Sequence, residues 1–435
     1  MTDVREPAEP GSGSSEIRNG DLVREAEPVS EVADIPLLSR PVDGVSEPLT
    51  TRAELRGLVE RMAAGTGPLA VDAERASGYR YSQRAYLVQM RREGVGTALI
   101  DPIELPDLSE LNDAIGDAEW ILHAANQDLP CLAELALTPK RLFDTELAGR
   151  LLGEERVALG TMVEQYLGVR LEKGHSAADW STRPLPHDWL VYAALDVELL
   201  IGLRAVLLDA LEQANKLHWA EQEFEAVRVA PQSPPRIDAW RRTSGIHKIH
   251  NRRQLAIVRA LWLARDEYAA ERDIAPGRIL PDTAIVEAAR AEPKRAAELS
   301  ALPVFGGPRQ RRQLARWLAA ISQAQTLPEA ELPPSTANVG EIIPPAARWR
   351  ERDPVAAVRL AALREVIAAV AEQYQVLAQN LLPSEIVRGL AWKPPAEATT
   401  DSIRTRLAQL GARDWQVELT AGRLAEVLAT LTVPD

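Results

Sequence analysis

The pattern of hydrophobic residues changes near residue 231, and this change constrains the fold more than any other feature. Between about residues 46 and 225, short apolar runs such as PLAVDAE (68–74) and EWILHA (119–124) predict strands, and stretches with helical spacing separate them. After PQSPPR (231–236), strand signals almost vanish and helical blocks recur. The pattern therefore predicts a mixed sheet with helices packed on it, followed by all-helical regions.

The composition is that of a multidomain protein without disulfides. A chain of 435 residues with a hydrophobic fraction of 46% is long enough for about two to four domains, each with its own core. Its one cysteine, Cys131, makes no intrachain disulfide and allows no cysteine-based zinc site, so we expect a cytoplasmic location. No stretch approaches the ~20 apolar residues of a membrane span, so we expect no membrane partner.

Composition and periodicity divide the chain into five predicted segments. They are a disordered acidic tail (1–45), a strand-and-helix domain (46–228), a helical domain (236–326), a Pro-rich linker (327–347) and a second helical domain (348–435). The two helical domains are similar in length, which suggests an internal duplication.

Two carboxylates end the first strand of the mixed region. Asp72 and Glu74 are two residues apart, and on a strand such residues project from one face, roughly 6 to 7 Å apart. Two unpaired carboxylates at this separation repel, so we expect a basic partner, a raised pKa or a divalent metal ion to offset the repulsion. Arg75 is adjacent, but strand alternation places its side chain on the opposite face.

Three further residues are candidates to join this pair. Asp128 lies where a predicted strand gives way to a helix, and Tyr192 and Asp196 are four apart in VYAALDV, so they share one face of a helix. Each also has an ordinary structural explanation: Asp128 as a residue that satisfies free N–H groups at a helix N-terminus, Tyr192 as a core residue, and Asp196 as surface charge. The order D-x-E, then D, then Y-x-x-x-D is harder to explain structurally than any member alone.

The order of these motifs resembles the ribonuclease D family, in the DEDD superfamily of 3′→5′ exonucleases. VDAERAS carries the Asp-x-Glu motif, HAANQDL the Asp of the second motif, and YAALD the third motif, Tyr-x3-Asp. The histidine subtype has a histidine five residues before the last Asp, where this chain has Val191, so the tyrosine subtype fits. Downstream, WLARDEYAAERDIAPGRILPDTAIVEAA resembles a helicase-and-RNase-D C-terminal (HRDC) domain, and 348–435 looks like a divergent second copy.

The resemblance implies an α/β, ribonuclease H-like exonuclease domain with a mixed sheet flanked by helices, followed by all-α helical-bundle domains. It implies a metal-dependent 3′→5′ exoribonuclease that removes nucleoside 5′-monophosphates from RNA 3′ ends. Asp72, Glu74, Asp128 and Asp196 would hold two Mg²⁺ ions, for which Mn²⁺ can substitute, because hard divalent cations prefer oxygen ligands. Tyr192 would orient the attacking water; at an unperturbed pKa near ~10, it suits hydrogen bonding better than proton abstraction.

A basic segment follows the mixed region and is a candidate surface for nucleic acid. The formal net charge is −13, so an anionic substrate requires a local cluster of cations. The segment RIDAWRRTSGIHKIHNRRQLAIVR (236–259) supplies one, with the candidate binding residues Arg241, Arg242, Lys248, Arg252 and Arg253. Such a run of charge also fits an ordinary solvated surface.

Three functions remain open at this point. The first is an exoribonuclease that acts in tRNA 3′ maturation or RNA turnover, with tRNA precursors as partners. The second is a 3′→5′ DNA exonuclease in repair, because the motifs bind the phosphodiester and the metal, and the contacts that recognise the 2′-hydroxyl cannot be located. The third is a catalytically silent nucleic-acid-binding protein. For each function we expect a monomer.

Overall fold

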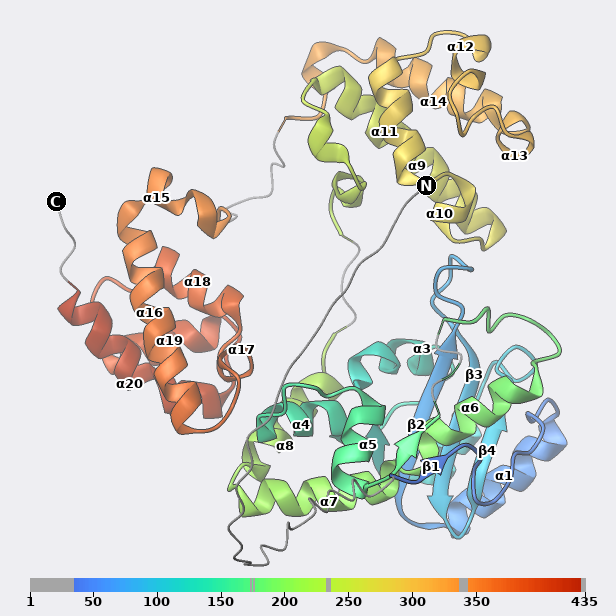
Figure 1. The fold of residues 1–435 in the computed structure, drawn as a ribbon, viewed down its shortest axis with the longest axis vertical. Helices are drawn as coiled ribbons and strands as arrows, with labels where there is room; N and C mark the ends of the chain where they lie inside the picture. The colour runs from blue at the N-terminus through green and yellow to red at the C-terminus, as the bar shows by residue number, and fades with distance from the viewer. Residues whose placement is uncertain (1–34, 173, 175–176, 232–235, 336–342, 432–435) are drawn as a thin grey trace, which may run out of the picture. The chain divides into compact units, whose positions relative to one another are not determined.

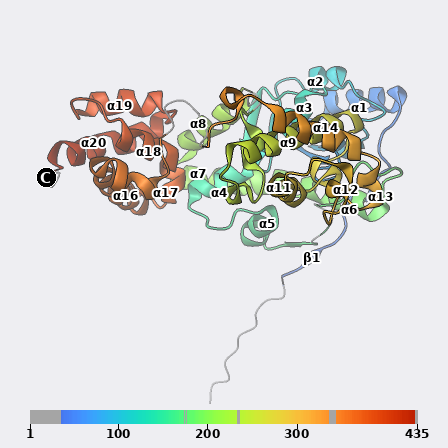
Figure 2. The same cartoon turned by 90° about the horizontal axis from the view of Figure 1, so that it is seen from above.

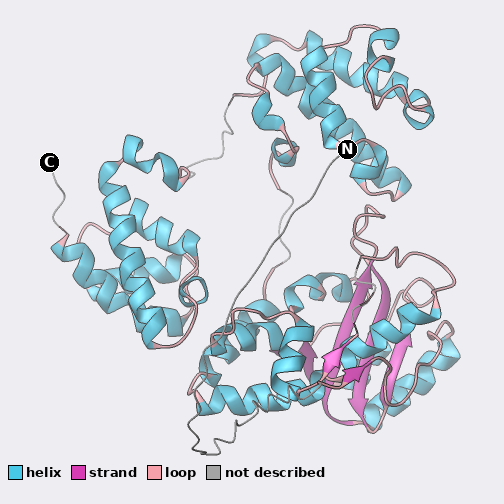
Figure 3. Ribbon diagram, viewed as in Figure 1, coloured by secondary structure: helices cyan, strands magenta, loops and turns pink. Residues whose placement is uncertain are grey.

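The computed structural model describes residues 35–172, 174, 177–231, 236–335 and 343–431. Within these ranges, a five-stranded mixed sheet with flanking helices is followed along the chain by helical regions (Figure 3). The fold class predicted from the sequence is therefore confirmed. Among the described residues, no helix has both the length and the apolar character that a membrane crossing requires.

The sheet has the strand order β4-β3-β2-β5-β6, and β2 is its central strand. β3 is antiparallel to β2 and β4, whereas β2, β5 and β6 run parallel. The strands are β2 (Thr66–Arg75), β3 (Ala85–Glu93), β4 (Gly96–Ile100), β5 (Glu119–Leu122) and β6 (Arg141–Asp144). Because parallel strands end at one edge of a sheet, residues that end β2 and residues that follow β5 meet there.

Alternation along β2 decides which face of the sheet carries the acidic residues. Val71 and Ala73 are buried in the main hydrophobic core, and Asp72 and Glu74 alternate with them. Leu87 on the neighbouring strand β3 belongs to a separate small apolar cluster. The acidic pair therefore faces away from the main core.

Helices cover both faces of the sheet. Figure 1 draws α6 (His187–Glu198) in front of the strands, and Figure 2 places α1 (Arg52–Ala64) and α2 (Ser109–Ile115) on the opposite side. α6 contacts β2, β3 and β4, so its inward side chains meet the acidic face of β2. The other helices of this region are α3 (Leu129–Ala133), α4 (Thr145–Leu152), α5 (Leu159–Leu167), α7 (Leu200–Gln213) and α8 (Leu217–Arg228).

The apolar stretch 186–215 forms two helices. α6 ends and α7 begins around Leu199, whose backbone has φ −104° and ψ 0°. α6 packs on β2, β3 and β4, whereas α7 packs mainly on α4 and α5. Both parts are apolar, and the break between them lets each part pack on a different partner.

The predicted disordered tail, 1–45, ends in a segment that is paired with the rest of the chain. Residues 1–34 of that tail lie outside the described residues. β1 (Leu37–Leu38) pairs in parallel with β7 (Arg170–Leu171), and the backbone N–H of Arg170 donates to the Pro36 carbonyl at 2.9 Å. The prediction of disorder is wrong for this stretch, because backbone pairing orders a segment whose side chains are largely exposed.

The first helical region has its own hydrophobic core. Trp317 and Phe305 are fully buried there, and Trp317 Nε1 donates a hydrogen bond of 2.9 Å to Gln310 Oε1. The helices are α9 (Arg252–Arg272), α10 (Pro276–Ile279), α11 (Asp282–Ala291), α12 (Ala296–Ser300), α13 (Pro308–Arg311) and α14 (Leu314–Thr326).

The predicted linker, 327–347, begins as part of this helical region. Leu332 is buried in the same core, and residues 336–342 of the linker lie outside the described residues. The linker prediction is therefore wrong at its start, since its proline-rich composition does not reveal that Leu327 and Leu332 pack on this core.

The last helical region is built around buried tryptophans. Trp349 and Trp415 are fully buried, and the Trp349 ring lies 4.9 Å from that of Trp392. The helices are α15 (Trp349–Arg352), α16 (Pro354–Gln373), α17 (Ala378–Leu381), α18 (Ser384–Trp392), α19 (Thr400–Gln409) and α20 (Asp414–Thr430).

Candidate active site

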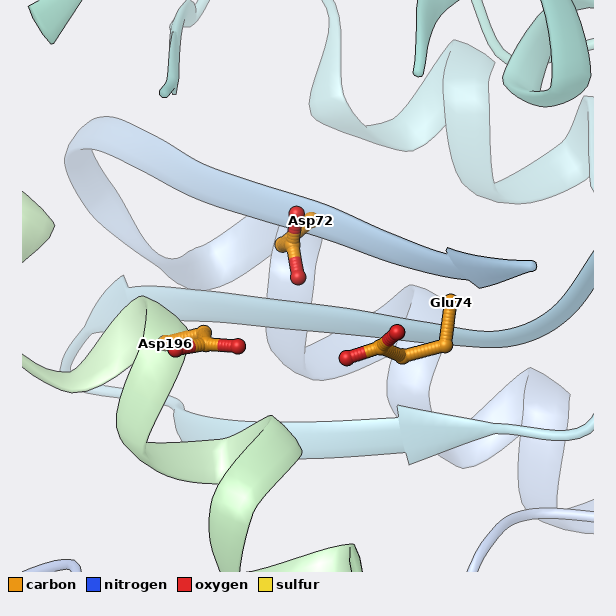
Figure 4. A group of neighbouring side chains, drawn as sticks. All are labelled: Asp72, Glu74 and Asp196. Carbon is orange, nitrogen blue, oxygen red and sulfur yellow. The ribbon is translucent and has the colours of Figure 1, made fainter. Parts of the chain in front are cut away.

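Three of the predicted acidic residues lie together between β2 and α6. One carboxylate oxygen from each of Asp72, Glu74 and Asp196 falls within 4.8 Å of the others. Figure 4 shows Asp196 extending from the green helix α6 toward the space that the two β2 carboxylates also face. Residues more than a hundred positions apart in sequence thus form one acidic cluster, as the motif order predicts.

Asp128 joins the site at its edge. It follows β5 and is 6% exposed. Besides burial, the charges of Asp72 and Asp196 both raise its pKa, which places Asp128 near these two acids. Its side chain makes no capping hydrogen bond to α3, the helix that it precedes. The alternative explanation of Asp128 as a helix cap is therefore wrong. Asp128 lies outside the tight group formed by the other three acids.

Arg75 reaches into the site, although strand alternation predicts that it points away. Its Nη2 lies 3.7 Å from Asp128 Oδ1. The pairing of β2 with β3 shifts register between Glu74 and Arg75, and such irregularities redirect side chains. The sequence pattern could not reveal this shift, because it depends on one residue of β3 that has no partner on β2.

Gln89 is a site residue that the sequence analysis missed. It lies directly opposite Asp72 on β3, is fully buried, and its Nε2 donates a hydrogen bond of 2.8 Å to Asp72 Oδ2. The signal that could have found it is the hairpin register, since the residue paired with an acid on the acidic face shares that face.

Tyr192 lies one helical turn before Asp196 on α6, and the two side chains share a hydrogen bond. The Trp180 ring lies 6.4 Å from the Tyr192 ring and is fully buried. Burial raises the pKa of Tyr192 well above its ordinary value, and the charge of Asp196 raises it further. The phenol is therefore protonated at neutral pH and acts as a hydrogen-bond donor.

The carboxylates lie in surroundings that disfavour their charged forms. Burial raises the pKa of Asp72 to about 6. For Asp128 and Glu74, burial and then the charge of Asp72 raise the pKa to about 8 and about 10. Burial and the charge of Asp72 also raise the pKa of Asp196. Four acids that repel one another in this way need a cation to be fully ionised together.

This donor set fits a divalent metal. Every side chain of the cluster offers carboxylate oxygen, which suits hard cations, and the described residues contribute a single loosely placed guanidinium, Arg75, as a counter-charge. A bound divalent cation would remove the repulsion that raises these pKa values. The cluster therefore indicates use of a divalent metal.

The predicted nucleic-acid-binding residues fall into two groups. Arg252 donates to the Leu332 carbonyl at 2.9 Å, Arg241 donates to the Pro334 carbonyl at 2.9 Å, and Arg253 donates to the Leu327 carbonyl. These three hold the start of the predicted linker against the first helical region. Arg242 and Lys248, in contrast, are exposed to solvent.

Family models match all three regions of the chain. The model described as 3′-5′ exonuclease matches residues 46–212, and the HRDC domain model matches 254–321. The model of a 3′ to 5′ exonuclease C-terminal domain matches 342–428. The two helical regions thus match different models, and these matches give no support to the predicted internal duplication.

Known proteins and structures resemble most of the chain. Ribonuclease D of Escherichia coli is 30% identical over 370 residues, which is 80% of this chain and 96% of that protein. The crystal structure of that ribonuclease D, an exoribonuclease involved in structured RNA processing, has a TM-score of 0.63 at 28% identity and covers 84% of this chain and 98% of its own. A crystal structure from Bifidobacterium adolescentis has a TM-score of 0.83 at 38% identity, covering 90% of this chain and all of its own.

The mixed sheet, its acidic cluster and the exonuclease model over the same residues define a 3′→5′ exonuclease. With the relatives above, the chain belongs to the ribonuclease D family and is a 3′→5′ exoribonuclease. The match to the HRDC domain model agrees with an enzyme that acts on nucleic acid. Neither a DNA repair exonuclease nor a silent binding protein is favoured by these relatives.

Proposed function

We propose that Asp72, Glu74, Asp128 and Asp196 hold two Mg²⁺ ions and that the site releases nucleoside 5′-monophosphates one at a time from RNA 3′ ends. The observation that carries this proposal is the convergence of Asp72, Glu74 and Asp196 within 4.8 Å, with Asp128 beside them. Two ions about 3.5–4 Å apart would match so dense a group of carboxylates. Mn²⁺ would substitute, because it accepts the same oxygen ligands.

In the proposed reaction, a water oxygen bonds to the phosphorus of the terminal phosphodiester. The bond from phosphorus to the 3′ oxygen breaks, and that oxygen takes a proton and leaves as the new 3′-hydroxyl. The ions, when bound, would lower the pKa of the attacking water and stabilise the leaving oxygen. The Tyr192 hydroxyl, which is protonated and linked to Asp196, would orient the water by hydrogen bonding.

We further propose that Arg242 and Lys248 contact RNA phosphates, with the neighbouring HRDC residues Arg241, Arg252 and Arg253 supporting the surface that carries them. Exposure of the first two residues supports direct contact, since exposed cations can release counterions from the RNA backbone. The backbone hydrogen bonds of the other three support an indirect role. Losing both exposed charges should weaken RNA binding and flatten its salt dependence.

The substrates proposed are structured RNAs, with tRNA precursors foremost. The similarity to E. coli ribonuclease D, an exoribonuclease involved in structured RNA processing, supports this class of substrate. We also propose a monomeric, cytoplasmic enzyme with an exonuclease domain over 46–228, helical domains over 236–326 and 348–435, and a linker, 327–347, whose start packs on the first helical domain.

Product analysis tests the proposed chemistry directly. The enzyme is incubated with RNA and Mg²⁺ in water enriched in ¹⁸O, and the released nucleotides are analysed by mass spectrometry. We expect nucleoside 5′-monophosphates with one ¹⁸O in the phosphate. Nucleoside 3′-phosphates, or label in the new 3′-hydroxyl, would contradict the proposal. Isothermal titration calorimetry of Mg²⁺ into wild type and into Asp196→Asn measures how many ions bind and how tightly. We expect the variant to bind fewer ions, or to bind them more weakly.

A further inference from the structure

Arg75 is a cation close to Asp72, Glu74 and Asp128, and it has no fixed hydrogen-bonding role. Its Nη2 lies 3.7 Å from Asp128 Oδ1, which is longer than the ~2.7–2.9 Å of a charge-assisted hydrogen bond. Across the described residues, the guanidinium makes no hydrogen bond. A guanidinium carries five N–H donors, so most of the binding capacity of Arg75 is unused.

Arg183, in the same domain, shows how a structural arginine is held. Its Nε and Nη2 bind the two oxygens of Asp101 at 2.6 and 2.8 Å, and it also donates to the carbonyls of Trp180 and Tyr86. Arg75 has none of these features, although its side chain is only 26% exposed. Its nitrogens are not among the buried unsatisfied atoms of the described residues, so they are open to solvent and free to bind an incoming ligand.

The position of Arg75 restricts what that ligand can be. The residue is next to Glu74 on β2, and the register shift at this point turns it toward Asp128 and the acidic site. The acids themselves would be neutralised by the divalent ions of the proposed function, which weakens their pull on the guanidinium. The anion that enters the same space during the reaction is the phosphodiester of RNA, and guanidinium groups bind phosphate oxygens in a bidentate manner.

We propose that Arg75 is a further catalytic residue, which donates hydrogen bonds to a non-bridging oxygen of the phosphodiester undergoing hydrolysis. This inference rests on the proposed function of the acidic site. Arg75 would leave Asp128 as the phosphate arrives and would stabilise the negative charge that builds up on the phosphoryl oxygens. The planar guanidinium can donate from two nitrogens at once, whereas the ammonium of a lysine is a single point charge. A lysine at position 75 would therefore replace the arginine only in part.

The test compares Arg75→Met, which removes the charge at similar length, with Arg75→Lys, which keeps it. Arg61→Met removes an exposed cation of α1 as the matched control, and Asp196→Asn tests the acidic site itself. Initial rates on a short RNA at saturating Mg²⁺ give kcat and KM. Inhibition constants are also measured for AMP and for adenosine, which lacks the phosphate. Their comparison reports how tightly each variant binds the phosphate, separately from its rate of hydrolysis.

We expect Arg75→Met to lower kcat/KM by about 10- to 100-fold, as loss of a hydrogen bond to a charged group does, with a smaller loss for Arg75→Lys. The inhibition constant of AMP should rise about tenfold while that of adenosine stays unchanged. Arg61→Met should match wild type, and Asp196→Asn should be inactive. If Arg75→Met does not fold in a thermal melt, Arg75→Lys decides by the same two readouts.

Two results would overturn the inference. If both Arg75 variants reach the wild-type rate once Mg²⁺ saturates, with unchanged AMP inhibition, Arg75 only balances charge in the metal-free protein. The inactive Asp196→Asn variant would then show that the acidic site still stands and that only the role of Arg75 is wrong. If Asp196→Asn is as active as wild type, the proposed function fails, and the inference fails with it.

Discussion

Gln89 lies directly opposite Asp72 across the β2–β3 pair, and its amide nitrogen donates a hydrogen bond of 2.8 Å to Asp72 Oδ2. Gln89 is fully buried, and its Oε1 accepts no hydrogen bond from the described residues. A buried polar side chain with one unsatisfied atom is costly. Its position is explained if it fixes the orientation of the Asp72 carboxylate, so we regard Gln89 as a positioning residue.

Replacing Gln89 by Leu should lower activity while keeping the fold. The hydrogen bond ends on a carboxylate, so its loss costs about 1.5–3 kcal/mol, and about 1.4 kcal/mol corresponds to a factor of ten. We therefore expect kcat to fall by about tenfold or more and the Mg²⁺ concentration for half-maximal rate to rise. Rate measurements over a Mg²⁺ series check this, with Gln83→Leu as the exposed control. An unchanged Mg²⁺ response would remove Gln89 from the site.

Replacing Tyr192 by Phe should slow turnover without changing metal binding. The lost hydroxyl is the hydrogen-bonding group that we expect to orient the water, so a decrease in kcat of about 10- to 100-fold is expected. Because burial raises the pKa of Tyr192 far above neutral, the pH profile of the remaining activity should keep its wild-type shape. Equal turnover by the variant would exclude Tyr192 from the mechanism, and a changed affinity for Mg²⁺ would indicate that it acts as a ligand.

Gly174 should tolerate no side chain, because its backbone lies against the Tyr192 ring. A Cβ at this position would lie 2.6 Å from Tyr192 Cδ2, closer than side chains approach one another. We expect Gly174→Ala to displace the ring and lower kcat to about the level of Tyr192→Phe. The double variant should be no slower than either single variant, since both act through one hydroxyl. Gly160→Ala, where nothing lies within 4 Å, is the matched control. Fully additive losses would mean that Gly174 acts elsewhere.

The metal-free protein should lose stability as pH rises. Burial raises the pKa of Asp72 to about 6. Burial, followed by the charges of neighbouring acids, raises the pKa of Asp128 to about 8 and that of Glu74 to about 10. In the unfolded chain these carboxyls titrate near ~4, so above that pH the folded state binds more protons than the unfolded state. The stability contributed by the protonated forms is complete below the unfolded pKa and is lost as pH passes through the folded pKa values.

Thermal melts in EDTA between about pH 4 and 10 measure this loss, a window that runs from the unfolded carboxyl pKa to the folded pKa of Glu74. We expect the Tm of wild type to fall across the window and that of Glu74→Gln to fall less. Saturating Mg²⁺ should flatten both profiles, because it stabilises the ionised carboxylates. The exposed Glu60→Gln serves as control. Identical slopes for wild type and Glu74→Gln would show that the acids do not repel one another as described.

The acidic cluster could be predicted from the sequence because it depends on local periodicity. Asp72 and Glu74 share a face because strand side chains alternate, and Tyr192 and Asp196 share a face because four residues make about one helical turn. The apolar neighbours Val71 and Ala73 indicate which face is buried. Periodicity does not show that the three elements meet; that expectation comes from the resemblance of the motif order to the ribonuclease D family.

The rest depends on register and packing, which local patterns do not encode. Gln89 joins Asp72 only through the pairing of β2 with β3, and Arg75 turns into the site only because that pairing shifts by one residue. Arg252 and Arg253 resemble a nucleic-acid surface in sequence, yet their donors bind carbonyls about 70 to 80 residues downstream. A run of basic residues cannot reveal that a later segment folds back onto it.

The central claim is that the carboxylates of β2 and α6 hold the metal that cleaves RNA from its 3′ end. The most direct test incubates 5′-labelled RNA carrying a 3′ extension, and matched single-stranded DNA, with wild type or Asp72→Asn in Mg²⁺ or EDTA, and resolves the products on a gel. We predict stepwise shortening of the RNA by wild type in Mg²⁺, no shortening in EDTA, and none by Asp72→Asn although it melts at least as high as wild type without metal. Shortening of RNA by Asp72→Asn at the wild-type rate, or by wild type in EDTA, would contradict the account.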